Sequence, residues 1–396
     1  MKVHADFVII GAGIVGLTVA YELTEKFPKS SIFVLDKEND IGMHASGRNS
    51  GVLHSGVYYG SDTLKAKVCS KGSKAMMAFA DENKIPYRKT GKVIIAKSNT
   101  DLKIIDNLIL NAKKNKVSAE KLTSDEIKKI EPYSSPYEYG IFCKDTAVID
   151  GKQVIEKIKD ILIKKKVKFI FNVVIEKIEP QNNYIYFNHT HIYYSLVYNC
   201  AGTGADEIAK KYDLGHEFTL IPFKGLYYKL DPKFNFMVNG NIYPVPDPKQ
   251  PFLGVHFTKN IHGNIYIGPT AIPALGKENY SLLEGINFKE AVGISFYLMQ
   301  MFLKNHQNFR KSAFSEIRKY SRYYFFNEAK KLVNSLEPKN LIPSEKIGIR
   351  PQLINKKTKK LEMDYIILKG NNSVNVLNSI SPAFTSSFEF AKYIIS

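Results

Sequence analysis

The sequence has few cysteines and no hydrophobic run long enough to cross a bilayer. Its three cysteines, Cys69, Cys143 and Cys200, are too few and too scattered for a disulfide framework or a metal cluster, so we predict no metal site. Small buried thiols in a reducing compartment are the simplest expectation. The main apolar runs, residues 7–20 and 291–303, fall short of the roughly 20 residues that span a bilayer. They predict a soluble, cytoplasmic protein without a cleavable signal, in which the second run is a packed helix.

Acidic residues are scarce relative to basic ones. The chain has 38 Asp and Glu against 56 Lys and Arg, a formal net charge of +18. The densest basic runs, residues 164–166 and 356–360, are short, and no basic face interleaved with aromatics is visible, which argues against nucleic-acid binding. Codon bias explains the excess most simply, because Lys, Asn, Ile, Tyr and Phe are all abundant. Peripheral contact with an anionic membrane, at its inner face, is the second explanation.

The beginning of the chain carries a glycine pattern between an apolar strand and a helix. Residues 7–10 predict the strand and residues 14–23 the helix. The pattern consists of Gly11, Gly13 and Gly16. Such glycines turn tightly, let the backbone approach a pyrophosphate and pack helix on strand, with the phosphates at the helix N-terminus.

Asp36 completes this pattern. It ends a second predicted strand, residues 31–35, and follows Gly16 by 20 residues. At that offset a carboxylate accepts hydrogen bonds from an adenosine ribose. Strand, glycines, helix and acid together predict a dinucleotide-binding site.

A second glycine pattern of this kind is missing. This argues against an enzyme with separate flavin and nicotinamide domains. If the single dinucleotide is FAD, electrons leave to oxygen, a quinone or a protein.

Local periodicity predicts the remaining elements coarsely. Helices are expected over residues 61–84, 101–115, 124–130, 153–165, within 288–336, and over 383–395. Strands are expected over residues 91–96, 167–171, 173–178, 194–202, 226–230, 241–245, 253–257, 265–268, 365–368 and 374–377. The short strands between residues 218 and 275 indicate a mainly β substrate-binding region.

Residues 44–59 form an unusual loop. They read His-Ala-Ser-Gly-Arg-Asn-Ser-Gly-Val-Leu-His-Ser-Gly-Val-Tyr-Tyr, with many polar groups beside glycines. A loop shaped around a flat polar ring needs this mixture, because its backbone must approach closely while polar groups bond the ring's edge. A solvated Gly/Ser loop is the alternative.

With these motifs the chain resembles the D-amino-acid-oxidase-like family of FAD oxidoreductases, and within it most closely the L-2-hydroxyglutarate oxidases/dehydrogenases. The resemblance covers nearly the whole chain. Beyond the first glycines it rests on residues 46–59, 64–67, 199–202, 241–247, 251–258, 268–271, 348–352 and 381–387. It implies an α/β fold: a Rossmann-like FAD-binding domain of the glutathione-reductase-like type, with an inserted mixed α+β substrate domain. The implied ranges are 1–85, 145–217 and 340–396 for the first, and 86–144 and 218–339 for the second.

The resemblance also implies which residues bind FAD. They are Gly11, Gly13, Gly16, Asp36, Ser46, Asn49, Ser50, Ile175, Ala201, Gly202, Pro382, Ala383 and Thr385. Of these, the last three lie at the start of the final helix, whose positive end can stabilise charge on the reduced flavin.

The implied reaction is oxidation of L-2-hydroxyglutarate, a small dicarboxylate, to 2-oxoglutarate. The alternatives are another 2-hydroxy acid, an amino acid or glycerol 3-phosphate as substrate, or flavin binding without turnover. Hydride transfer from a 2-hydroxy acid needs a base for the hydroxyl proton, and histidine titrates nearest to working pH. His54 and His256 both lie inside the matching motifs. We favour His256 as the base, because it lies on a strand of the presumed substrate domain, and expect the other to orient the substrate.

A dicarboxylate also needs cations. Arg350, within Gly-Ile-Arg-Pro, is the candidate partner of the C1 carboxylate. Arg48 and Lys224 are secondary candidates for the distal carboxylate, and Tyr243 for a hydroxyl contact. Lys224 stands where the family commonly has arginine and Thr270 where it commonly has asparagine, which leaves another hydroxy acid possible as substrate.

Overall fold

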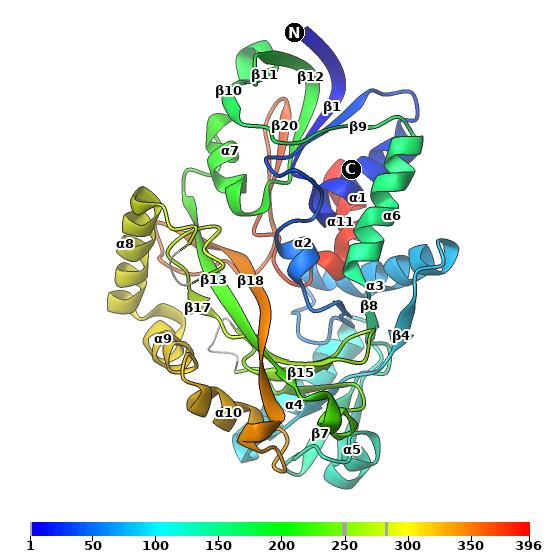
Figure 1. The fold of residues 1–396 in the computed structure, drawn as a ribbon, viewed down its shortest axis with the longest axis vertical. Helices are drawn as coiled ribbons and strands as arrows, with labels where there is room; N and C mark the ends of the chain where they lie inside the picture. Colours follow the sequence, from blue (N-terminus) through cyan, green and yellow to red (C-terminus); the bar gives the residue numbers. More distant parts are fainter. Residues whose placement is uncertain (1, 248–251, 282–283) are drawn as a thin grey trace.

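A computed structural model describes residues 2–247, 252–281 and 284–396. The described residues form two large sheets and one small sheet, stacked along the long axis of the molecule with helices on their flanks (Figure 1). The last helix packs beside the first, so the C-terminus lies at the end of the first helix, below the N-terminus in Figure 1.

A mainly parallel sheet is built around the first strand. β1 (Lys2–Ile10) pairs in parallel with β12 (Thr190–Asn199) on one side and β2 (Ile32–Leu35) on the other. The sheet is completed by β9 (Lys168–Ile170), β10 (Ile175–Glu179), β11 (Tyr184–Phe187), β19 (Ile366–Lys369) and β20 (Ser373–Leu377). The strand predicted from residues 7–10 begins earlier, and its last three residues are buried, as expected for a strand covered on both faces.

Helices from distant parts of the chain cover this sheet. α1 (Ile14–Lys26) packs against α11 (Ala383–Ile395), which in turn packs against α3 (Leu64–Glu82). α6 (Gly151–Lys164) contacts α1 as well. These helices share one apolar core with β1 and β2, so the N- and C-terminal segments form a single unit with the middle of the chain.

A mainly antiparallel sheet lies in the other half of the molecule (Figure 1). Its longest pairing joins β13 (Phe218–Leu230) to β18 (Leu341–Asn355). The other strands are β5 (Val93–Ile95), β6 (Glu120–Thr123), β7 (Tyr139–Phe142), β14 (Asn241–Pro244), β15 (His256–Lys259), β16 (Ile265–Gly268) and β17 (Ile272–Pro273). A small sheet consists of β3 (Val52–Leu53), β4 (Tyr87–Lys89) and β8 (Ala147–Ile149). Pro251, which opens one of the resemblance motifs, lies outside the described residues.

β18 was not predicted from the sequence, and β13 was predicted only over residues 226–230. Two prolines and a glycine interrupt the pattern of β18, and these residues are typical of turns. The strand forms because it pairs with β13 along its length. Since β18 belongs to the antiparallel sheet, we propose that the substrate-binding part extends to Asn355 and that the last FAD-binding segment begins after it.

Further helices flank the antiparallel sheet and its connections. They are α2 (Ala45–Arg48), α4 (Asn99–Lys114), α5 (Ser124–Ile130), α7 (Ala205–Lys211), α8 (Phe288–Lys304), α9 (Phe309–Arg318) and α10 (Arg322–Lys330). The helical stretch expected within residues 288–336 is confirmed. The expectation that residues 291–303 form a packed helix is only half right, because α8 buries Ile294 and Met301 but exposes much of its opposite side. None of the helices in the described residues combines the length and apolarity that a membrane span requires. The three cysteines are free and buried.

Candidate active site

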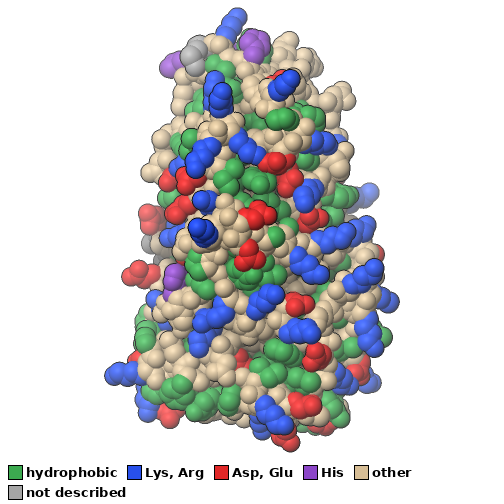
Figure 2. All heavy atoms as spheres, turned by 90° about the vertical axis from the view of Figure 1, so that its right-hand side faces the viewer, with side chains coloured by type: hydrophobic (Ala, Val, Ile, Leu, Met, Phe, Trp, Pro, Cys, Tyr) green, Lys and Arg blue, Asp and Glu red, His purple; other side chains and the backbone are tan. Residues whose placement is uncertain are grey.

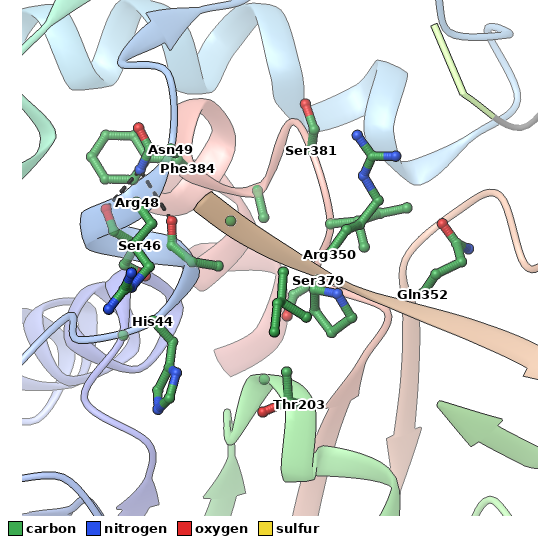
Figure 3. Close-up of a pocket in the computed structure, with 18 of the residues that line it drawn as sticks. His44, Ser46, Arg48, Asn49, Thr203, Arg350, Gln352, Ser379, Ser381 and Phe384 are labelled. Atoms are coloured by element: carbon green, nitrogen blue, oxygen red, sulfur yellow. Dashed lines mark hydrogen bonds between the residues drawn. The ribbon is translucent and has the colours of Figure 1, made fainter. Parts of the chain in front are cut away.

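One large cavity brings the motifs together. Its volume is about 1480 Å³, and its walls come from both large sheets, the loop around α2 and the first turns of α1 and α11. Pockets for single small molecules are typically about 300–1,000 Å³, so there is room for a long cofactor and a small substrate. Figure 3 shows its centre, where α2 and its loop face β18. Of the site residues predicted from the sequence, all but Gly16 and Lys224 line the cavity.

The glycine turn is closed by tight backbone contacts. Gly11 has φ +109°, and a Cβ on it would lie 2.4 Å from the carbonyl oxygen of Cys200. A Cβ on Gly16 would lie 1.9 Å from the carbonyl oxygen of Gly11. Gly16 therefore holds α1 against the turn without facing the cavity, whereas Gly11 and Gly13 line it.

Substitution of Gly16 tests this close approach. We expect Gly16→Ala to yield protein that is destabilised and retains little flavin, because the added methyl group cannot fit without moving the turn. Gly293→Ala is the matched control: it also lies in a helix, but a Cβ added there would meet nothing within 4 Å. The two variants are compared by their thermal unfolding temperature and by their flavin absorbance per mole of protein. Equal flavin content and stability in the two variants would contradict the assignment.

Asp36 supports the turn as well as lining the cavity. Its carboxylate accepts hydrogen bonds from the backbone N–H of Ala12 at 2.6 Å and of Glu38 at 2.9 Å. The acid thus fixes the glycine turn at the end of β2. Nearby, Ile175, Ala201 and Gly202 line the same end of the cavity.

The loop around α2 is held by its own polar side chains. The Ser46 hydroxyl accepts from the backbone N–H of Ile14 at 2.9 Å, which ties this loop to the start of α1. The Asn49 amide donates to the Ser46 carbonyl at 2.6 Å (Figure 3). The Asn49 side-chain oxygen accepts from the Gly51 N–H at 2.8 Å. Ser50 lines the cavity beside them. These bonds hold the loop in one conformation against α1.

Two histidines line the cavity from opposite parts of the fold. Burial, reinforced by the charge of Lys92, lowers the pKa of His256 to about 4 and that of His54 to about 3. Both imidazoles are therefore neutral at pH 7. The backbone N–H of His54 donates to Thr385 Oγ1 at 3.2 Å, and its Nε2 lies 3.4 Å from Ser381 Oγ. His54 is thus fastened to the segment that leads into α11.

His256 is oriented for proton acceptance. Its Nδ1 lies 2.9 Å from the carbonyl oxygen of Gly254. A carbonyl only accepts, so Nδ1 carries the hydrogen and Nε2 keeps the lone pair. The ring of Tyr243 lies against it, with centroids 4.0 Å apart.

Arg350 is a half-buried cation on β18 whose side chain lines the cavity. Its guanidinium lies 4.9 Å from the Phe252 ring, and among the described residues no carboxylate is within 4 Å of it. Desolvation lowers the pKa of Arg350, and its charge in turn lowers the pKa of His256. A partly desolvated cation without a protein anion favours an anionic ligand.

The two secondary cations are engaged elsewhere. Arg48 donates to the Met43 carbonyl at 3.0 Å, and its guanidinium lies 4.2 Å from the Tyr280 ring. Lys224 does not line the cavity; its ammonium donates to Asn279 at 3.0 Å and to the Ser281 carbonyl. The Lys224 side chain is therefore held by the segment of residues 279–281 outside the cavity. The structure does not support the prediction that Lys224 contacts the distal carboxylate of the substrate.

The comparisons with known proteins agree with this geometry. Residues 6–395 match the model of the FAD dependent oxidoreductase (DAO) family. This chain belongs to that family. FAD is therefore its cofactor, and the protein is an FAD-dependent oxidoreductase.

Relatives of this oxidoreductase cover almost its full length. It is 34% identical over 388 residues to the L-2-hydroxyglutarate dehydrogenase of Indibacter alkaliphilus, covering 96% of this chain and 95% of that protein. It is 30% identical over 400 residues to the L-2-hydroxyglutarate dehydrogenase of Escherichia coli K12, covering 99% and 92%. Among solved structures, the dithionite-reduced, FAD-bound L-α-glycerophosphate oxidase of Mycoplasma pneumoniae aligns with a TM-score of 0.78 at 21% identity, covering 99% of this chain and 94% of that one. That likeness shows the fold.

The cavity of the oxidoreductase fits FAD at two places. α1 and α11 both begin at the cavity wall, and neither has a side-chain N-cap. Helix N-termini favour negative charge. The first, beside Gly11 and Gly13, would hold the pyrophosphate; the second, at Pro382, Ala383 and Thr385, would face the flavin.

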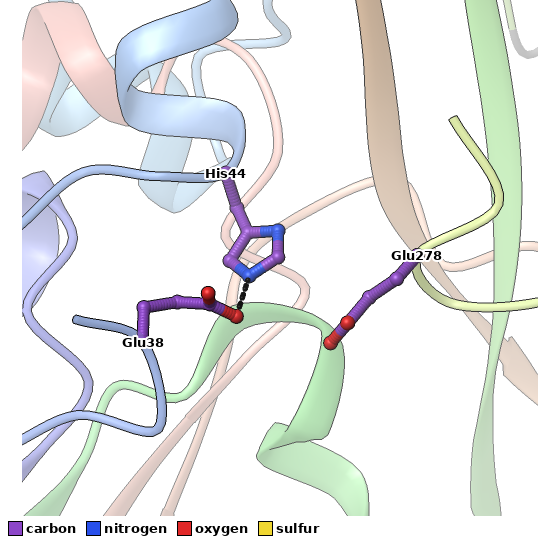
Figure 4. A group of neighbouring side chains, drawn as sticks. All are labelled: Glu38, His44 and Glu278. Atoms are coloured by element: carbon purple, nitrogen blue, oxygen red, sulfur yellow. Dashed lines mark hydrogen bonds and ion pairs between the residues drawn. The ribbon is translucent and has the colours of Figure 1, made fainter. Parts of the chain in front are cut away.

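A polar cluster lines one part of the cavity wall (Figure 4). Glu38, His44 and Glu278 place their side-chain ligand atoms within 4.8 Å of one another. His44 Nε2 bonds Glu38 at 2.8 Å, and its Nδ1 lies 2.7 Å from the Tyr280 hydroxyl; Glu278 pairs with Lys37. These bonds connect residues 278–280 to the segment after β2, and the three groups have protein partners.

Two lysines were missed by the sequence analysis. Lys65, within the quoted residues 64–67, lines the cavity; its ammonium donates to the Met363 carbonyl at 2.6 Å, and burial lowers its pKa to about 8. Lys92 is buried 4.4 Å from the Tyr58 ring and 5.1 Å from the Tyr243 ring, with no hydrogen-bond partner for its ammonium among the described residues. The only feature of the sequence that could have indicated a buried lysine at position 92 is its place directly before an apolar strand.

Proposed function

We propose that this oxidoreductase converts L-2-hydroxyglutarate to 2-oxoglutarate. The names of its relatives suggest the substrate. The observation that carries the proposal is a half-buried arginine that lines one cavity with two histidines and has no carboxylate within 4 Å among the described residues. An anionic 2-hydroxy acid needs this pairing of cation and base.

The chain's own groups would divide the work. Arg350 binds the C1 carboxylate and orients C2, with the Tyr243 hydroxyl as a further contact. His256 Nε2 accepts the hydroxyl proton as the ketone forms, while His54 holds the segment before α11 and orients the substrate. FAD supplies the acceptor for the hydride that leaves C2. Removal of that hydride and that proton accounts for both hydrogens lost in the reaction.

Anaerobic reduction of the bound flavin tests the substrate. We expect L-2-hydroxyglutarate to bleach the flavin, and the D-enantiomer to do so at least about a hundredfold more slowly, because a fixed carboxylate and base present only one C2–H to the flavin. Glycerol 3-phosphate and amino acids serve as comparison substrates. Faster bleaching by one of these would replace the proposed substrate, and no bleaching by any would indicate flavin binding without turnover.

The electron acceptor is measured in the same experiment. Readmission of oxygen, or of a soluble quinone without oxygen, to the bleached enzyme compares the two acceptor classes directly. A quinone that reoxidises the flavin faster than oxygen does identifies a dehydrogenase.

The dependence of kcat/KM on pH tests the histidine base. Because the pKa of His256 is lowered to about 4, the imidazole stays neutral as pH falls through 6.5 and becomes protonated only near pH 4. We expect kcat/KM to fall on the acid side near pH 4 and to be retained at about pH 5.5. Flavin absorbance at each pH controls for unfolding. An acid limb near pH 6.5 that disappears in His256→Gln would show that the base is not desolvated as described.

A further inference from the structure

α8 carries a stripe of apolar side chains that are mostly exposed. Its members are between 54% and 82% exposed. They are Phe288, Val292, Phe296, Met299 and Leu303. Steps of four, four, three and four residues keep them within an arc of about 80° on the helix.

The opposite side of α8 already holds the helix in place. Ile294 and Met301 are buried in a cluster with Ile221 and Phe223 of β13. The exposed stripe therefore adds nothing to the packing of α8. Five exposed apolar side chains along one side of a helix indicate an interaction site.

The surface continues over the next two helices. Phe302 and Phe314 have ring centroids 5.7 Å apart, and Arg310 donates to the carbonyls of Phe302 and Leu303 at 2.7 and 2.8 Å, which joins α9 to the end of α8. The exposed apolar and aromatic side chains beyond α8 are Phe314, Ile317, Tyr320, Tyr323 and Tyr324. We call this surface, together with the stripe on α8, the apolar face. Figure 1 shows α8, α9 and α10 along one flank of the molecule.

The exposed charged side chains on residues 288–331, which carry the apolar face, all have one sign. The exposed ones on residues 288–331 are Lys289, Lys304, Arg310, Lys311, Arg318, Arg322, Lys330 and Lys331. The acids of the same segment are not exposed: Glu316 is buried beside Lys319, while Glu290 and Glu328 are half-buried. On the side of the molecule seen in Figure 2, by contrast, acidic and basic side chains are interspersed.

We propose that the apolar face docks on a lipid bilayer that carries anionic headgroups. Exposed Phe, Met and Leu would enter the headgroup–acyl boundary, the tyrosines would lie at its level, and the surrounding cations would pair with acidic lipid. α8 lies in the plane of the interface, since only one side of its 17 residues is free. A second copy of the chain is disfavoured, because a symmetric contact would bring the same cations against each other.

Vesicle binding by the full-length holoenzyme tests the proposal, and no substrate is needed, so its result is independent of the proposed reaction. The chain contains no tryptophan, so Phe296→Trp supplies a single reporter. We expect its emission to shift to the blue with vesicles of phosphatidylcholine containing about a quarter phosphatidylglycerol, less with phosphatidylcholine alone, and less as salt rises. Leu110→Trp is the matched control, because Leu110 is exposed to a similar extent on α4, which packs on β6 and β7; it should show no shift.

Loss of binding tests the residues. The double variant Phe288→Glu/Phe296→Glu should co-sediment with the acidic vesicles at least about tenfold more weakly, and Lys304→Glu/Lys311→Glu should lose the preference for acidic lipid. Leu110→Glu should bind as the unaltered protein does. Flavin absorbance and molecular mass in solution are measured on each variant.

Three results would overturn the proposal. The unaltered protein does not bind acidic vesicles; the variants on the apolar face bind as well as Leu110→Glu; or the protein is a dimer in solution that Phe288→Glu/Phe296→Glu dissociates. The last result would assign the apolar face to a second copy of the chain.

Discussion

Replacement of His256 with glutamine is expected to lower kcat by about 10²–10⁴-fold, the range for loss of a positioned base. Glutamine keeps a side chain of similar reach and can donate to the Gly254 carbonyl, but it cannot accept the hydroxyl proton. The loss should appear at saturating substrate and in the rate of anaerobic flavin bleaching. Binding of the substrate should change much less, because the carboxylate contact is at Arg350.

His54→Gln and His216→Gln serve as controls for this prediction. His54 is tied to Thr385 and Ser381, so we expect a smaller loss of kcat accompanied by a change in the flavin spectrum. His216 is exposed and pairs with Asp213 far from the cavity, so its replacement should leave turnover unchanged. Unchanged turnover in His256→Gln, or a larger loss in His54→Gln, would reverse the assignment of the base.

Replacement of Arg350 has the second large expected effect. Arg350→Lys keeps the charge but loses the two-pronged contact with a carboxylate. It should lower kcat/KM by about ten- to 150-fold, as expected for a charge-assisted bond of about 1.5–3 kcal/mol. Arg350→Met removes the charge and leaves the substrate carboxylate buried and unpaired. A cost of about 2–5 kcal/mol then predicts a loss of roughly 30-fold to several thousandfold.

The split between the two kinetic constants distinguishes binding from folding effects. A binding role predicts a raised KM in both variants, with flavin content and thermal unfolding temperature retained in Arg350→Lys. Arg88→Lys is a control at an exposed arginine on β4. Wild-type kinetics in Arg350→Met would remove this residue from the substrate site.

The glycine turn and the strands and helix around it could be predicted from the sequence, because these parts are local. The glycines, the adjoining strand and helix, and Asp36 lie within one β-α-β segment, where spacing in sequence fixes spacing in space. The polar loop of residues 44–59 was predicted in the same way, and its Ser46 hydroxyl reaches α1.

The direction of individual side chains could not be predicted. Phe223 of β13 is paired with Arg350, and Lys224 with Ile349. Neighbours on a strand point to opposite faces of the sheet, so Lys224 and Arg350 cannot both face the cavity. That pairing joins segments far apart in the sequence, and the interrupted pattern of β18 gave no hint of it.

The sequence alone determined the cofactor class, the helices and strands with regular periodicity, and the residue types available for acid–base chemistry and anion binding. The tertiary structure decided which cations enter the cavity, which face of α8 is left uncovered and where the excess positive charge gathers. The physical reason is range: turns, helices and glycine contacts depend on residues close in the chain, whereas burial, strand pairing and charge distribution depend on contacts between distant segments.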